Sequence, residues 1–215
     1  DNCEVCGAKY EAAELINPVS TISGEKPIVK TSEHVFFKLS KLESNVANWM
    51  RATPLQEAVK NKLEEWFQQG LKDWDISRDS PYFGFEIPDM HDKYFYVWLD
   101  APIGYIASLE NYLRSNDKES AEEIWSENVN TEIYHFIGKD IMNFHALFWP
   151  ALLETSNFKK PSNVFVHGFL SLNGAKMSKS RGNFLSMKDF IEILDADYIR
   201  YYLASKLSPS IDDID

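Results

Sequence analysis

Apolar residues at helical spacing predict two consecutive helices in the first third of the chain. Between residues 55 and 67 they recur every three or four positions, which is the period of one helix face. Pro54 precedes this segment, and Gly70 follows it as a helix-ending residue. An earlier helix is expected from Ser40, acting as its cap, to about Arg51. A short turn would join the two helices as an antiparallel pair.

Short apolar runs without helical spacing predict β-strands, because strands are only a few residues long. The segment Trp74–Asp79 is more polar, and we expect it to be a loop. Pro88 would stop the strand that precedes it. The expected strands are Val35–Phe37, Tyr82–Ile87, Tyr94–Leu99, Glu132–Ile137 and Val164–Leu172.

Helical segments separate the last three of these strands. One begins at Pro102 and runs to about Arg114, and another covers Asp140–Glu154. Pro150 lies inside the second helix and predicts a kink or a break there. The alternation of strands and helices predicts a parallel sheet covered by helices. Three such strands make half of a doubly wound nucleotide-binding sheet, and we expect the other half upstream of this chain.

Turn and capping residues organise the carboxyl-terminal part of the chain. Asn173-Gly174 is a tight-turn signal, and a polar, basic loop follows over Ala175–Asn183. Ser186 with Asp189 resembles a capping box, and Asp195 is a second candidate cap. The helices that they would begin are Met187–Leu194 and Ala196 to about Lys206.

The composition is that of a folded globular protein, since 44% of the 215 residues are apolar and 26% are charged. No apolar run approaches the ~20 residues that a membrane-spanning helix needs. No signal peptide is recognisable. The net charge of −11 disfavours general nucleic-acid binding, because phosphate contacts need clustered Lys and Arg. The first Met is Met50, so we expect the chain to come from a longer protein.

Cys3 and Cys6 are the only cysteines of the sequence, and they form a Cys-x-x-Cys pair followed by Gly7. Two cysteines are too few for the disulfide framework of a small secreted protein, which favours the cytoplasm. Zinc prefers four tetrahedral ligands, and a turn of this kind presents two thiolates to one ion. We therefore interpret the pair as half of a four-cysteine zinc site, with the other half upstream. The alternative is two ordinary surface thiols.

Three cations, Lys176, Lys179 and Arg181, lie close together on the loop that follows the last expected sheet strand. In open α/β sheets, ligands bind beyond the carboxyl ends of the strands. Lysines there can neutralise a triphosphate, and they contribute most where negative charge accumulates as pyrophosphate leaves. The alternative is a solvated basic loop, which would explain the charges but not the particular order of residues.

The segment Lys176-Met177-Ser178-Lys179-Ser180 resembles the second signature of class I aminoacyl-tRNA synthetases. Other segments are similar to methionyl-tRNA synthetases of the bacterial type, and this resemblance runs from Asp1 to Asp215. The leucyl, isoleucyl and valyl enzymes share the lysine segment but not a counterpart of Trp98–Tyr105. The segments that resemble the methionyl enzymes are Trp74–Asp79, Tyr96–Tyr105, Phe136–Ile141 with Phe144-His145, and the Cys3 and Cys6 pair.

The resemblance implies the carboxyl-terminal half of a doubly wound, Rossmann-like parallel sheet with part of an inserted connective subdomain. Residues 1–90 would form the connective subdomain with half of a zinc knuckle. Residues 91–175 would form the second half of the catalytic domain. Residues 176–215 would hold the lysine loop and the start of the helical region that contacts the tRNA stem. The implied location is the cytoplasm, without a membrane partner.

The implied reaction joins methionine to ATP, with Mg²⁺, to give methionyl-adenylate and pyrophosphate, and then transfers methionine to tRNA(Met). Lys176 and Lys179 would hold the phosphates, and Arg78 would hold negative charge between the two substrates. The ribose would contact Gly138 and Asp140. Main-chain groups near Leu170 would contact adenine. A structural zinc ion in the full protein would be held in part by Cys3 and Cys6.

The resemblance also implies a pocket for the methionine side chain. A thioether is apolar and polarizable, and it packs well on aromatic rings. Tyr105 and His145 would be the polar groups available to its sulfur atom. The implied pocket residues are Trp98, Ala101, Pro102, Tyr105, Ile141, Phe144 and His145.

Structural roles are the alternatives for several of these residues. Trp98 ends an apolar run and would by default belong to a core. His145 shares a helix face with apolar residues and would be a core histidine with its hydrogen bonds satisfied. Asp140 would cap a helix, and Arg78 would form a surface ion pair of small energetic value. His135 and His167 receive no functional role.

The chain departs from the family pattern in several respects, since we find no counterpart of its amino-terminal strands, of its first zinc ligands or of its anticodon-reading helical domain. The first class I signature, His-Ile-Gly-His, is absent from the sequence. We therefore expect the 215-residue chain alone not to catalyse, although the protein that contains it would. Two alternative functions remain open. One is a class I synthetase of another amino-acid specificity, and the other is a non-catalytic fold or tRNA-docking fragment.

Overall fold

The computed structural model describes residues 14–20, 22–116, 118, 120–127, 129–177, 182 and 184–215. The chain divides into two compact units, Asp1–Glu33 and His34–Asp215. In the first unit, the Ser20 hydroxyl accepts hydrogen bonds from the main-chain N–H groups of Ile22 and Ser23. All elements described below belong to the second unit.

Two helices follow the short strand β1 (Phe36–Phe37), as the apolar spacing predicts. They are α1 (Glu43–Ala52) and α2 (Glu57–Gln69), and Gly70 ends the second one. The expected role of Ser40 as a helix cap is wrong. Its hydroxyl instead donates a hydrogen bond of 2.6 Å to a carboxylate oxygen of Asp73, and Ser40 lies inside a 3₁₀ turn that precedes α1.

The segment expected to be a loop forms two strands, so that prediction is wrong. β2 (Trp74–Asp75) pairs antiparallel with β1, and β3 (Ser77–Asp79) pairs antiparallel with β4 (Lys93–Phe95). Polar residues are accommodated because they pair across the ribbon, as the Lys93 ammonium does with the Asp79 carboxylate.

The expected strand over 82–87 is also wrong, since this segment contributes only an isolated bridge between Glu86 and Tyr94. Of its side chains only Ile87, at the end of the segment, is buried. Phe83 is fully exposed, and Phe85 is 71% exposed. An apolar run therefore formed no regular strand here because no second layer buries one of its faces.

The apolar run over 94–99 changes from strand to helix after Tyr96. Its first part belongs to β4, and its second part forms the helical turn α3 (Val97–Asp100). Periodicity cannot distinguish a buried strand from a buried helical turn over so few residues. Helix α4 (Ile103–Arg114) then begins at Pro102, as expected, and a short helix α5 (Ala121–Ile124) follows it.

The two expected strands on either side of the central helix form a parallel pair in register. They are β5 (Tyr134–Gly138) and β6 (Asn163–His167). The third strand expected in this sheet, β4, instead pairs with β3 in the antiparallel ribbon. Within the described residues, the strands form separate two-stranded sheets, so the fold is α/β with small sheets.

The helical connection between β5 and β6 is irregular, as Pro150 predicts. It begins as a 3₁₀ turn (Lys139–Ile141), continues as a π-helical segment (Phe144–Phe148) and ends as α6 (Trp149–Thr155). Pro150 lies in the first turn of α6, directly after the π-helical segment, so the wider turn falls where the proline cannot donate a helical hydrogen bond. The break therefore precedes the proline rather than following it.

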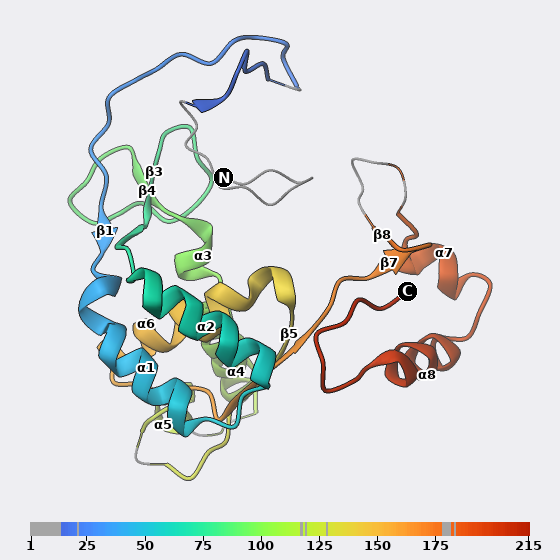
Figure 1. Ribbon diagram of the computed structural model, residues 1–215. Helices are drawn as coiled ribbons and strands as arrows, with labels where there is room; N and C mark the ends of the chain where they lie inside the picture. The colour runs from blue at the N-terminus through green and yellow to red at the C-terminus, as the bar shows by residue number, and fades with distance from the viewer. Residues whose placement is uncertain are drawn as a thin grey trace. The chain divides into compact units, whose positions relative to one another are not determined.

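The main core joins α1 and α2 to the β5–β6 pair and to the helical connection between these strands (Figure 1). Its side chains come from one face of each element, which is what the helical and strand periods of the sequence require. The opposite face of the parallel pair carries an aromatic stack, in which the rings of Phe136 and Phe165 lie 4.9 Å apart. The most deeply buried core members are Leu39, Val46, Met50, Val59, Leu63, Ala146, Ala151, Val164 and Val166.

Beyond β6 the chain forms a hairpin of β7 (Ser171–Leu172) and β8 (Ala175–Lys176). The Asn173-Gly174 turn has positive φ angles of 53° and 73°, so this turn prediction is confirmed. Two helices follow, and their caps are also confirmed, since Ser186 and Asp195 accept hydrogen bonds from main-chain N–H groups of the first turn. These helices are α7 (Met187–Ile191) and α8 (Ala196–Lys206).

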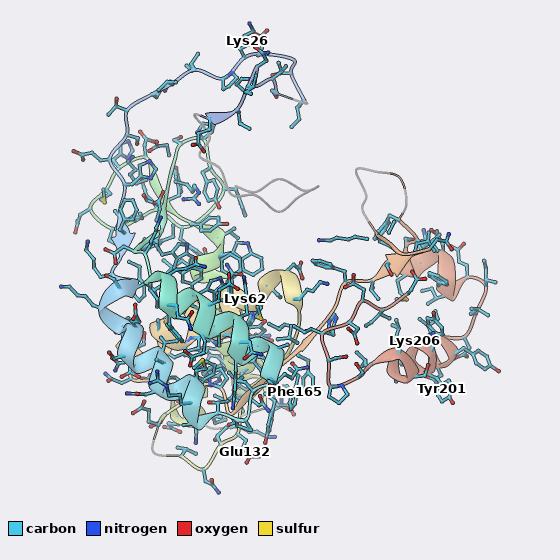
Figure 2. All side chains as sticks on the ribbon, in the orientation of Figure 1. Lys26, Lys62, Glu132, Phe165, Tyr201 and Lys206 are labelled. Atoms are coloured by element: carbon cyan, nitrogen blue, oxygen red, sulfur yellow. The ribbon has the colours of Figure 1, made fainter. Side chains whose placement is uncertain are left out.

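Side chains of α8 project outward, and Figure 2 labels Tyr201 and Lys206 among them. Tyr201 is 77% exposed. In the part of the chain that the structure describes, no helix combines the length and the apolar character needed to cross a bilayer.

Candidate functional site

Three of the predicted site residues, Cys3, Cys6 and Lys179, lie outside the described residues. Among the described residues, no cluster of three or more His, Cys, Asp or Glu side chains could hold a metal ion. The other predicted residues fall into two groups. One group surrounds the beginning of α4, and the other lies at the carboxyl ends of β5 and β6.

The first group is built on stacked aromatic rings. Trp98 of α3 lies nearly parallel to Phe144, with 4.3 Å between ring centroids and 10° between planes. Trp74 stacks in the same way on Phe148, at 4.1 Å, and approaches Phe144 at 6.2 Å. The π-helical segment therefore brings two aromatic side chains to one surface, which receives a tryptophan from α3 and another from β2. We name these four residues the aromatic cluster.

Arg78 joins the aromatic cluster through Tyr96. Its guanidinium carbon lies 3.9 Å from the centre of the Tyr96 ring, and that ring meets Trp74 edge-on at 6.2 Å. Arg78 also donates a hydrogen bond of 2.6 Å to the Ser77 carbonyl and lies 3.5 Å from a carboxylate oxygen of Asp75. The expected ion pair between Arg78 and Asp75 exists. The guanidinium also lies over the Tyr96 ring, and such a cation–π contact is stronger when the cation is shielded from water.

Tyr105 and His145 form a hydrogen bond of 2.8 Å between the phenol oxygen and Nε2. Nδ1 of the same imidazole lies 3.0 Å from the main-chain carbonyl of Ile141. Because a carbonyl oxygen can only accept, Nδ1 carries the proton, and the Tyr105 hydroxyl donates to Nε2. Burial lowers the pKa of His145 and raises the pKa of Tyr105, so both groups are held neutral.

His135, to which the sequence assigned no role, is buried and packs against the rings of Tyr105 and His145. It is 6% exposed, and its Nε2 accepts a hydrogen bond of 3.2 Å from the indole N–H of Trp149. Its ring centre lies 4.9 Å from that of Tyr105 and 5.4 Å from that of His145. Burial, together with the nearby His145, lowers the pKa of His135 to about 4. Its alternation with Ile137 along β5 was the sequence signal for an inward position.

The remaining predicted pocket residues lie on the same elements. Pro102 is buried at the start of α4, whereas Ala101 beside it is exposed. The main-chain N–H of Tyr105 donates to the Pro102 carbonyl, so the first turn of α4 fixes where the phenol stands. Ile141 is half-buried and packs against the main core. The structure thus brings Trp98 and Phe144 together, and Tyr105 and His145 together.

The second group begins at Gly138, where β5 ends. A Cβ atom on Gly138 would lie 2.6 Å from a carboxylate oxygen of Asp140 and 3.7 Å from the imidazole of His167. Only glycine allows the Asp140 carboxylate to fold back against the strand end in this way. Asp140 is exposed and makes no side-chain cap bond to its 3₁₀ turn, which disfavours the simple capping role.

Lys176 and Leu170 lie on the extended segment that follows β6. The Lys176 ammonium is 3.6 Å from the centre of the Phe169 ring, and the Lys139 ammonium is 4.4 Å from the same centre. The Leu170 carbonyl accepts a hydrogen bond of 3.0 Å from the Met177 N–H, so the main chain at Leu170 fixes the start of the cationic segment. Both groups of predicted residues therefore occur in the second unit of the chain.

The whole sequence matches one protein family. A family model described as tRNA synthetases class I (M) matches residues 1–215. The chain belongs to this family. The segments that resemble this family contain the Tyr105–His145 pair, Lys176 and every member of the aromatic cluster except Phe148.

Solved structures of Mycobacterium tuberculosis methionyl-tRNA synthetase are similar to this chain. Two of them are described as bound to, or in complex with, methionyl-adenylate, with sequence identities of 33% and 34% and TM-scores of 0.66 and 0.67. Each similarity covers 86% of this chain and 35% of the other. An apo form is similar at 28% identity and a TM-score of 0.65, over 91% and 36% of the two chains. This chain thus spans about a third of the length of the structures that it matches.

Proposed function

We propose that this chain is part of an enzyme that activates methionine with ATP and transfers it to tRNA(Met). The observation that carries the proposal is the family match over residues 1–215. The methionyl-adenylate named for two similar structures supports methionine and ATP as the substrates. Neither activation nor transfer requires a redox centre or a covalent enzyme intermediate.

The aromatic cluster and the Tyr105–His145 pair support a methionine pocket. A flat indole stacked on Phe144 offers an apolar, polarizable surface, which a thioether side chain contacts favourably. Since the Tyr105 hydroxyl donates its one proton to His145, Tyr105 would meet a thioether through its aromatic ring. The proposed pocket residues are Trp98, Ala101, Pro102, Tyr105, Ile141, Phe144 and His145.

The second group supports an ATP site. In adenylate formation the carboxylate of the amino acid attacks the α-phosphorus, and pyrophosphate leaves. Catalysis then consists of positioning the substrates and stabilising charge on the phosphates. We assign the phosphates, with Mg²⁺ as their counter-ion, to Lys176 and Lys179, and the charge between the substrates to Arg78. The ribose and adenine are assigned to Gly138, Asp140 and main-chain groups near Leu170.

The wider architecture is part of the proposal. The parallel β5–β6 pair, with a helical connection between the strands, is the unit from which a doubly wound, Rossmann-like sheet is built. We assign residues 1–90 to a connective subdomain, 91–175 to the catalytic half-domain, and 176–215 to the lysine loop and the helical region. Cys3 and Cys6 would supply two of four zinc ligands, and the protein would act in the cytoplasm.

ATP–pyrophosphate exchange by the full-length protein tests the proposal. We expect exchange that depends on methionine and is weak with leucine, isoleucine or valine. A larger exchange with another amino acid would mean a synthetase of different specificity, and exchange with none would contradict the proposal. The 215-residue chain alone, which lacks His-Ile-Gly-His, should show no exchange. Lys179→Ala in the full-length protein should lower kcat far more than methionine affinity.

A further inference from the structure

The carboxyl-terminal segment of the chain lies against the residues that follow β6. The Ile214 N–H donates a hydrogen bond of 2.8 Å to the Phe169 carbonyl, and the Ser171 N–H donates one of 2.8 Å to the Ile214 carbonyl. These two bonds make a parallel bridge between Leu170 and Ile214. Ile214 is 6% exposed, so the segment is packed as well as hydrogen-bonded.

A glycine makes this approach possible. A Cβ atom on Gly168 would lie 2.1 Å from the carbonyl oxygen of Asp212 and 2.6 Å from the main-chain nitrogen of Asp213. Such distances are far inside van der Waals contact, so the two main chains can pass each other only where no side chain stands between them. The carboxyl-terminal segment is therefore held at one defined place beside the end of β6.

Asp213 uses this place to contact Lys139 and Phe169, which are neighbours in the chain of Gly138, Asp140 and Leu170 of the second group. One carboxylate oxygen accepts a hydrogen bond of 2.8 Å from the Phe169 N–H and one of 2.5 Å from the Lys139 ammonium. The hydrogen bond from Lys139 is the main cause that lowers the pKa of Asp213, and the charge of Lys176 acts in the same direction. The carboxylate is therefore ionised at neutral pH.

Through Lys139 and Phe169, Asp213 connects two parts of the proposed ATP site, the Gly138–Asp140 turn and the segment that carries Lys176. Lys139 stands between Gly138 and Asp140 in the chain. Its ammonium and that of Lys176 lie 4.4 Å and 3.6 Å from the centre of the same Phe169 ring. Two cations so close to one ring repel each other, and one carboxylate beside them offsets this repulsion. The turn after β5 and the start of the cationic segment are thereby fixed to a common support.

We propose that Asp213 is a positioning residue of the ATP site, which holds Lys139 and Phe169 in place and thereby fixes Lys176 relative to the Gly138–Asp140 turn. This inference rests on the proposed function. Asp213 would touch neither substrate. Its contribution is preorganisation, because lysines held at fixed positions stabilise charge on departing pyrophosphate without rearranging during the reaction.

The test is Asp213→Asn in the full-length protein, measured by methionine-dependent ATP–pyrophosphate exchange. Asparagine keeps the size of the side chain and an oxygen for the Phe169 N–H, but it removes the charge that holds Lys139. We expect kcat to fall about tenfold, because small displacements of positioning groups have effects of this order or larger, while the KM for methionine changes less than about twofold. Asp212→Asn is the matched control, since it makes the same charge change one residue away, where the carboxylate accepts a hydrogen bond from the Ser210 hydroxyl instead of from Lys139.

A double-mutant cycle with Lys139→Met completes the test. If Asp213 acts through Lys139, Asp213→Asn should lower kcat much less in the Lys139→Met background than in the natural protein. Exposed ion pairs contribute little to stability, so the melting temperature of Asp213→Asn should stay close to that of the natural protein. A fall in melting temperature with a matching rise in the KM for methionine would mean a merely structural role and overturn the inference.

The outcomes separate this inference from the proposed function. Normal kcat in Asp213→Asn, or equal losses in Asp213→Asn and Asp212→Asn, would overturn the inference and leave the proposed function standing. Absence of exchange in the natural full-length protein would overturn both.

Discussion

The indole N–H of Trp149 donates a hydrogen bond of 3.2 Å to Nε2 of His135, and both side chains are almost completely buried. This bond joins the first residue of α6 to an inward-facing residue of β5. It also leaves His135 against the rings of Tyr105 and His145, so a bond within the core supports the polar side of the proposed methionine pocket.

Replacing His135 should destabilise the fold by leaving a buried donor without a partner. We expect His135→Phe to lower the free energy of unfolding by about 1–3 kcal/mol, the usual penalty for an unsatisfied buried group. Equilibrium urea unfolding of the chain measures this change. His135→Gln retains an acceptor and should lose less. Equal losses in the two variants would mean that the size of the ring, and not its hydrogen bond, is responsible.

The lowered pKa of His135 predicts a loss of stability in mild acid. The folded protein releases the His135 proton at a pKa of about 4, whereas the ordinary value is 6.5. The unfolded chain therefore binds more protons between these values, and the contribution of the neutral imidazole is complete above pH 6.5 and declines as the pH falls toward 4. The lowered pKa of His145 acts in the same direction.

The expected effect is a decrease of about 2 kcal/mol in the free energy of unfolding between pH 7 and pH 5 that is assignable to His135. It is measured as the difference between the natural chain and His135→Gln, because carboxylates titrate alike in both. Parallel pH profiles for the two proteins would contradict the prediction.

Removing the indole of Trp98 should weaken methionine binding more than ATP binding. Trp98 stacks on Phe144 at 4.3 Å, so Trp98→Ala would remove one wall of the proposed pocket. We expect the KM for methionine to rise about tenfold and the KM for ATP to change little. The control is Trp66→Ala, which removes a half-buried tryptophan of α2 from the main core. A similar rise in the KM for methionine in the control would show that general destabilisation explains both.

Adding a methyl group at Gly138 should impair the ATP site by displacing Asp140. The new Cβ atom would lie 2.6 Å from the Asp140 carboxylate oxygen, so the carboxylate must move. We expect Gly138→Ala to lower kcat/KM for ATP about tenfold or more. The control is the double variant with Asp140→Ala. If displacement of Asp140 is the mechanism, the double variant should be no worse than Asp140→Ala alone.

Local signals made the helices of this chain predictable from its sequence. The caps Ser186 and Asp195, Pro102 at the start of α4 and Gly70 after α2 act within a few residues of themselves. Their effects do not depend on distant partners, and the structure confirms them. Ser40 is the exception, because its hydroxyl finds a partner in Asp73, a residue far away in sequence.

Strand pairing was less predictable because it depends on which segments meet. The antiparallel ribbon of β3 and β4 joins residues such as Arg78 and Tyr94 across a long loop, and no local pattern marks that choice. The parallel partners β5 and β6 were predicted from the helix between them. The second group of site residues was named as a set of candidates by resemblance alone, and nothing in the sequence indicated that Asp213 reaches Lys139 and Phe169.

The bare main chain at Gly168 has a practical consequence. One added carbon atom there would force the main chain at Gly168 away from that of Asp212 and Asp213, more than forty positions later in the sequence. Gly168→Ala would alter neither charge nor polarity, yet it would separate residues 212–214 from the main chain that follows β6. This substitution is therefore a way to weaken the packing of residues 212–214 while every ionisable group of the molecule is retained.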